Sequence, residues 1–148
     1  MIRVFYIPEE AFIVRALIAN GVNINTSYPA LRNETALMMA ASHGNTEVIQ
    51  MLIENSANID AGDDQRNTPL MQATRCGRKG IVHMLIEKSA SVDARNCNQE
   101  TALMDAVRLG QAEIAQILVN QGASVNAMGK SGQTVVRYAA RLEGGCHA

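Results

Sequence analysis

Large aromatic side chains are scarce in this sequence: Phe, Tyr and Trp make up 3% of its 148 residues, and tryptophan is absent. Hydrophobic residues of all kinds nevertheless make up 47%, and charged residues only 18%, which argues against intrinsic disorder. A core without large rings must be filled by Leu, Ile, Val, Ala and Met. The composition therefore favours closely packed helices in a single domain over residues 1–148.

The sequence also lacks a strong net charge, long apolar runs and paired cysteines. Its formal net charge of −1 gives no overall field that would attract nucleic acid or a membrane surface. No apolar stretch approaches the roughly 20 residues of a membrane helix, and MIRVFYIPEE is too short and too acidic for a signal-peptide core. Cys76, Cys97 and Cys146 show no Cys-x-x-Cys spacing, so we expect free thiols and a cytoplasmic, reducing location.

Catalytic and metal-binding motifs are missing as well. The sequence contains no G-x-G-x-x-G, no Walker loop, no H-E-x-x-H and no G-x-S-x-G. His43, His83 and His147 are scattered, and the terminal pair Cys146-His147 has no further ligands nearby. We therefore expect a non-enzymatic protein that uses neither a cofactor nor a metal.

What the sequence does contain is a repeat of 33 residues. Thr35 opens the segment TALMMAASHGN, and comparable segments open at Thr68, Thr101 and Thr134. A second series, SANIDA, SASVDA and GASVNA, runs in phase with the first, and segments such as EVIQMLIEN between the two have apolar residues at helical spacing. Each unit thus predicts two short helices and a hairpin. No unit can bury its own faces alone, so the units must stack.

Several features of the repeat carry a family resemblance. Thr68-Pro69-Leu70, the glycine in the middle of each unit and the closing run 122–126 (GASVN) resemble the ankyrin repeat, and the likeness extends over residues 9–143. The resemblance implies an all-α solenoid, an ankyrin-repeat stack of helix-turn-helix units with connecting β-hairpin loops. Met38, Met71 and Met104 replace the usual histidine, which the family packs between units, so we expect them to fill the core.

The period divides the chain into complete and half units. They are a half-repeat over 9–25 with the second helix only, complete repeats over 30–62, 63–95 and 96–128, a half-repeat over 129–143 with the first helix only, and a disordered tail over 144–148. Arg137 replaces the core methionine in the last unit, which favours a capping element. If the chain is complete, Met1–Ile7 should cover the face of the Glu9–Asn20 helix. If it is a fragment of a longer array, this segment should be mobile and the face should be prone to association.

The hairpin turns depart from the family pattern. The turn glycine is retained only at Gly132 and is replaced by Asn33, Arg66 and Gln99. Asparagine accepts a positive φ fairly well, whereas arginine and glutamine do so poorly. We therefore expect less ideal turns before Thr68 and Thr101, with no threat to the fold.

The resemblance also implies a protein–protein interaction module. In the family, partners are usually held on the concave surface by the hairpin tips and the exposed face of the first helix. The positions of this sequence that we expect to bind a partner are Arg32, Met39, His43, Asp64, Gln65, Gln72, Arg75, Cys76, Asn98, Asp105, Arg108, Leu109, Lys130, Tyr138 and Arg141.

Three of these residues recur with the period. Arg75, Arg108 and Arg141 predict a ladder with rungs about 10 Å apart, which would suit the carboxylates of an acidic or mixed acidic-apolar partner segment. Solvated charges near helix C-termini would give the same pattern, and Glu100 or Asp105 can pair with Arg108 internally.

Two other functions fit the same sequence. One is a regulatory subunit that docks on an enzyme and inhibits it, and the other is self-assembly through the half-repeat ends. We expect a monomer that binds protein, with no nucleic acid and no membrane involved.

Overall fold

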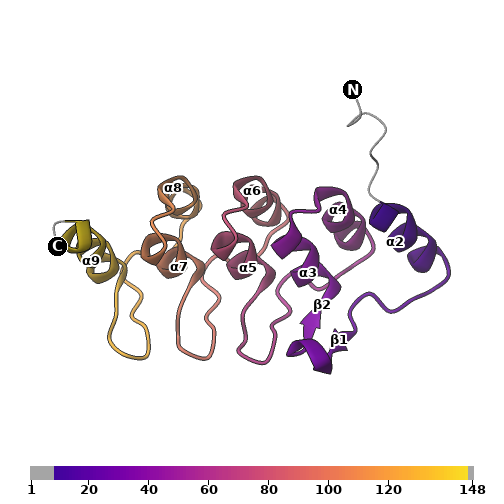
Figure 1. The fold of residues 1–148 in the computed structure, drawn as a ribbon, viewed down its shortest axis with the longest axis horizontal. Helices are drawn as coiled ribbons and strands as arrows, with labels where there is room; N and C mark the ends of the chain where they lie inside the picture. The colour runs from indigo at the N-terminus through magenta and orange to yellow at the C-terminus, as the bar shows by residue number, and fades with distance from the viewer. Residues whose placement is uncertain (1–8, 147–148) are drawn as a thin grey trace.

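The computed structural model describes residues 9–146, and the side chains of residues 13–141. Its helices form two rows with loops projecting from one side, and the chain runs through the units in order (Figure 1). The inner row, next to the loops, comprises α3 (Ala36–His43), α5 (Pro69–Arg75), α7 (Ala102–Arg108) and α9 (Val135–Cys146). The outer row comprises α2 (Glu9–Ala19), α4 (Thr46–Glu54), α6 (Lys79–Glu87) and α8 (Ala112–Asn120). The predicted solenoid of stacked helical units is confirmed.

A threonine starts each inner helix. The side-chain oxygen of Thr35 accepts a hydrogen bond of 3.3 Å from the backbone N–H of Met38, and Thr68 and Thr101 cap the next two inner helices in the same way. Each cap satisfies one of the N–H groups that the first turn of a helix leaves without an intrahelical partner. The repeated threonine therefore fixes where each unit begins.

A glycine ends the first three inner helices. Gly44, Gly77 and Gly110 have φ values of 77°, 69° and 72°, a left-handed backbone that turns the chain toward the outer row. The equivalent position in the last unit is Glu143, which lies inside α9, and the helix continues to Cys146. The helix thus passes the position of the stop signal and includes residues 144–146, although two of them are glycines. The prediction of a disordered tail over 144–148 is therefore wrong for these three residues.

The core lies between the rows and between successive units. The leucine of each complete outer helix is at most 1% exposed, as the repeat predicted: Leu52, Leu85 and Leu118. The three methionines in the inner helices are equally buried, so their role as core residues is confirmed: Met38, Met71 and Met104. Arg137, at the next position of that series, is exposed.

The loops share one turn geometry despite their different sequences. Asn33, Arg66, Gln99 and Gly132 have φ values of 61°, 63°, 61° and 78°. Arg66 and Gln99 thus adopt the conformation that these side chains disfavour, as the sequence predicted. Regular strands form in the first loop, where β1 (Ser27–Tyr28) and β2 (Glu34–Thr35) are antiparallel and flank a 3-10 turn over 29–31.

The N-terminal end of the stack has an outer helix without an inner partner among the described residues. The predicted covering segment, Met1–Ile7, lies outside these residues. Within residues 9–146, no helix combines the length and the apolar character needed to cross a bilayer.

Candidate functional site

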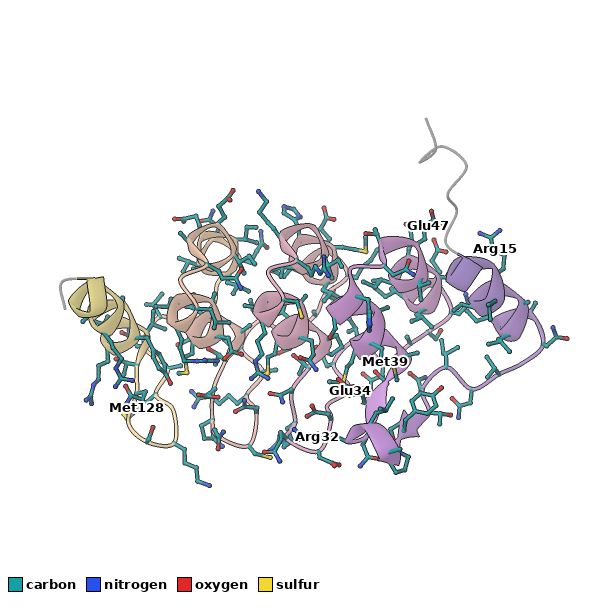
Figure 2. All side chains as sticks on the ribbon, viewed as in Figure 1. Arg15, Arg32, Glu34, Met39, Glu47 and Met128 are labelled. Carbon is teal, nitrogen blue, oxygen red and sulfur yellow. The ribbon has the colours of Figure 1, made fainter. Side chains whose placement is uncertain are left out.

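The candidate site is the surface formed by the loop tips and the exposed side of the inner helices, here called the inner surface. Figure 2 shows Arg32 among the loops and Met39 beside α3, on the side of the stack from which the loops project. The position of each side chain on this surface depends on how the loops are held together.

Successive loop tips are joined by backbone hydrogen bonds. The N–H of Asp64 donates to the carbonyl of Arg32 at 2.9 Å, and the N–H of Cys97 donates to the carbonyl of Gln65 at 2.8 Å. The third link repeats the pattern, since the N–H of Lys130 donates to the carbonyl of Asn98 at 2.9 Å. The tips therefore form one continuous row, and their side chains keep a fixed spacing along the stack.

Polar side chains inside the loops hold each turn. The Oδ1 atom of Asp63 accepts hydrogen bonds of 2.9 Å from the N–H groups of Gln65 and Asn67. Asn96 does the same one repeat later, and its amide also donates to Oδ1 of Asn67 at 3.1 Å. These bonds stabilise the strained turns at Arg66 and Gln99, because they satisfy backbone groups that the turns would leave unpaired.

Asp63 and Asn96 were missed at the sequence level. Both stand 33 residues apart at the start of a turn, and the signal was available, since Asp and Asn commonly bond to the backbone two residues further on.

An ion cluster lies between the second and third complete repeats. Oδ2 of Asp105 is 2.9 Å from Nε of Arg75, and its Oδ1 is 2.9 Å from Nη2 of Arg108. The Asp105 side chain is only 1% exposed, whereas those of Arg75 and Arg108 are 27% and 42% exposed. One buried carboxylate therefore pairs with two rungs of the predicted arginine ladder and offsets the charge of one of them.

The charge of Arg108 is further stabilised by its surroundings. The hydrogen bond to Asp105 raises the pKa of the Arg108 guanidinium. Partial burial lowers this pKa, but the negative charges of Asp105 and Glu100 raise it further, so the net change is upward. Arg108 is thus held as a cation at the edge of the inner surface, with one side against Asp105 and the other accessible.

Tyr138 closes the C-terminal side of this network. Its ring packs against Met104 and Ala127, and its hydroxyl donates to Oε2 of Glu100 at 3.4 Å. Burial raises the pKa of the Tyr138 phenol, and the charge of Glu100 adds to the increase. A hollow of about 280 Å³ beside the ring is lined by Asn98, Glu100, Gly129, Lys130, Ser131 and Tyr138.

The predicted site residues fall into three groups. Exposed on the inner surface are Arg32, His43, Asp64, Gln65, Cys76, Asn98, Arg108, Leu109, Lys130 and Arg141. Half-buried are Met39, Gln72 and Arg75. Asp105 and Tyr138 are buried, so the prediction that they are exposed on this surface is wrong, while their contact with a partner stays a prediction. The physical reason is that the arginines cover Asp105, whereas Met104 and Ala127 enclose the ring of Tyr138.

No metal site emerges from the described side chains, where no three His, Cys, Asp or Glu residues converge. Cys76 and Cys97 are exposed free thiols, in agreement with the prediction that they form no bond with each other. The chemistry of the inner surface is therefore that of hydrogen bonding, charge and apolar contact.

Comparison with curated proteins found no match to the chain. The family model of ankyrin repeats in three copies matches residues 8–96 and 89–147, which together cover nearly the whole sequence. The 33-residue period, the threonine caps and the stacked helix pairs of the chain agree with that match. Ankyrin repeats generally serve as protein–protein interaction modules. The chain belongs to the ankyrin-repeat family.

Proposed function

We propose that the chain binds a protein partner through the inner surface of its second and third complete repeats and the last loop. The observation that carries the proposal is the continuous row of loop tips, along which exposed polar groups keep a fixed spacing. Leu109, 44% exposed, adjoins Arg108 at the end of α7. This pair offers an exposed apolar side chain beside a guanidinium, and arginine is one of the residue types enriched at interface hot spots.

The charge of this surface favours a mixed partner segment over a purely acidic one. Asp105 already pairs with Arg75 and Arg108, so a partner carboxylate at Arg108 would share the guanidinium with it. Exposed ion pairs contribute only about 0–1 kcal/mol each. Affinity should therefore depend on burying Leu109, with Arg108 and Lys130 selecting for acidic groups beside the apolar contact. The exposed thiols of Cys76 and Cys97 favour a reducing compartment such as the cytoplasm.

Site-specific photo-crosslinking tests the proposed surface before the partner is known. A photoreactive amino acid at Gln65 or Leu109 reports on the inner surface, and one at His83 or Gln116 reports on the exposed side of the outer helices. We expect the same partner to be captured from both inner positions and from neither outer position. Capture from the outer positions alone would overturn the proposal.

A second measurement tests the role of Leu109. Against the captured partner, Leu109→Ala should weaken binding by roughly tenfold, because loss of an interface anchor costs more than about 1 kcal/mol. The matched control is Val119→Ala, which changes a side chain of similar exposure on α8. If the partner proves to be an enzyme, its activity with and without the chain will show whether docking is inhibitory.

A further inference from the structure

The outer helix α2 has an exposed apolar face that the other outer helices bury. Outer helices α4, α6 and α8 pack against the inner helices of their own units, whereas α2 packs mainly against α4 (Figure 1). The turns after α2 and α4 are equivalent, since Val22 donates to the carbonyl of Leu17 as Ala57 does to that of Leu52. Leu17 therefore occupies the position of Leu52, yet Leu17 is 49% exposed and Leu52 only 1%.

A groove lies next to α2, on the side of α3 where the inner helix of a preceding unit would pack, and α2 contributes Val14 to its lining. It has a volume of about 560 Å³ and lies between α2, the first loop and α3. Its lining is mainly apolar and includes Val14, Tyr28, Leu31, Met39, His43 and Val48. Tyr28 and Leu31 are 42% and 46% exposed, so the groove leaves considerable apolar surface uncovered.

We propose that this groove is the docking site of residues 1–8 of the same chain. Residues 1–8 directly precede Glu9, the first residue of α2. The chain enters α2 at the end where the other units connect their inner and outer helices. Most of the eight side chains can contribute apolar surface, among them Ile2, Val4, Phe5, Tyr6 and Ile7.

Reach and tethering both favour this occupant. Eight residues span about 12 Å as a helix and up to about 26–29 Å when extended, so either form can follow the groove. A segment joined directly to the site has an effective concentration in the millimolar range, well above that of a free competitor. The sequence attached to α2 therefore has the advantage over an unlinked peptide of equal affinity.

A second copy of the chain fits the groove less well. The complementary element would be α9, an inner helix whose own unit has no outer helix among the described residues. Arg137 of α9 occupies the position of the buried methionines, and the groove lining contains no acidic residue. Insertion of α9 would bury this cation without a partner, close to His43, which is strongly unfavourable.

Docking of residues 1–8 is independent of the proposed partner site, but it would limit how far that site extends along the inner surface. Met39 and His43 line the groove, and both are among the predicted partner contacts. Docking of residues 1–8 would cover them and leave partner binding to the second and third complete repeats.

NMR spectroscopy of the full chain provides the test. In the monomer we expect nuclear Overhauser contacts between the ring of Phe5 and the methyl groups of Met39 and Leu31. Phe5→Asp should remove these contacts and speed amide exchange in α2 by roughly tenfold or more, because burial of one large apolar side chain shifts an equilibrium at least that far. Phe5→Leu, which keeps an apolar side chain, should retain slow exchange.

The control is Val136→Asp, at an exposed position on α9 at the other end of the stack, which should leave exchange in α2 unchanged. A monomer without these contacts, whose α2 exchange is unaffected by Phe5→Asp, would overturn the proposal. Association that depends on concentration and is abolished by Met39→Asp would also overturn it, in favour of a second copy. Neither result would bear on the crosslinking test at Leu109.

Discussion

Arg75 and Asp105 are joined across the boundary between two repeats by a salt bridge of 2.9 Å, and the carboxylate is almost completely buried. Asp105 is also 2.9 Å from Arg108 of its own helix, so a single acidic group links α5 to α7. Two members of the arginine series predicted from the 33-residue spacing, Arg75 and Arg108, therefore have a structural role as well as an exposed edge.

Removing the two arginines together should destabilise the protein more than removing the whole cluster. Arg75→Ala/Arg108→Ala leaves the Asp105 carboxylate without a counter-ion but also opens it to water, so we expect a cost of about 1–3 kcal/mol in the free energy of unfolding. Adding Asp105→Ala removes that charge and should restore part of the loss. Urea denaturation of the single, double and triple variants measures the coupling. A triple variant less stable than the double would contradict this account.

The inter-repeat core provides a second prediction. Leu85→Ala should lower the free energy of unfolding by about 2–5 kcal/mol, because the leucine is fully buried and its loss leaves a cavity. His83→Ala, on the exposed side of the same helix, should change it by less than about 0.5 kcal/mol. A loss below about 1 kcal/mol for Leu85→Ala in urea titrations would mean that the assigned register of α6 is wrong.

The fold could be predicted because its signals repeat in the sequence. Thr35 and Gly44 mark the start and the end of a helix by local backbone chemistry, and the same residues recur one period later. The stop signal also accounts for the error at the C-terminus, since Glu143 stands where Gly44 stands in the first complete unit, and α9 continues past it.

The site was harder to predict because exposure depends on neighbouring units. Met39, Gln72, Asp105 and Tyr138 share one repeat position, yet the first two are half-buried and the last two are buried. The difference arises from side chains in adjacent elements, such as Arg75 over Asp105. A 33-residue period fixes which positions face the inner surface, but it does not encode what covers them.

The strained turns give a third prediction. Arg66→Gly and Gln99→Gly should each stabilise the protein by about 0.5–1 kcal/mol. Both residues have a positive φ, which costs a residue with a side chain about 1–2 kcal/mol. The greater freedom of glycine in the unfolded chain offsets part of this gain. Gly132→Ala is the reverse control and should be destabilising, because the φ of Gly132 is 78°. No atom lies within 4 Å of an added Cβ, so neither a clash nor a new contact would obscure the cost of the backbone conformation. Thermal unfolding would reveal a disagreement if both glycine variants melted below the parent protein.

Tyr138 gives a prediction about alkaline pH. Burial, together with the negative charge of Glu100, raises the pKa of the phenol in the folded protein above its ordinary value of 10.0. The folded state therefore holds this proton more tightly than the unfolded state does. The associated stabilisation is fully present below pH 10 and is lost as the pH rises through the folded-state pKa.

Urea titrations at increasing pH measure this effect, with ultraviolet absorbance reporting ionisation of the phenol. The chain has three tyrosines, so Tyr138→Phe is required to assign the change. This variant keeps the ring against Met104 and removes the ionisable group, so its stability should fall less steeply above pH 10 than that of the parent. Tyr28→Phe, at an exposed position in the first loop, should leave the steep fall intact. Equal slopes for the parent and Tyr138→Phe would show that the phenol is already solvated in the folded protein and that the contact with Glu100 does not form.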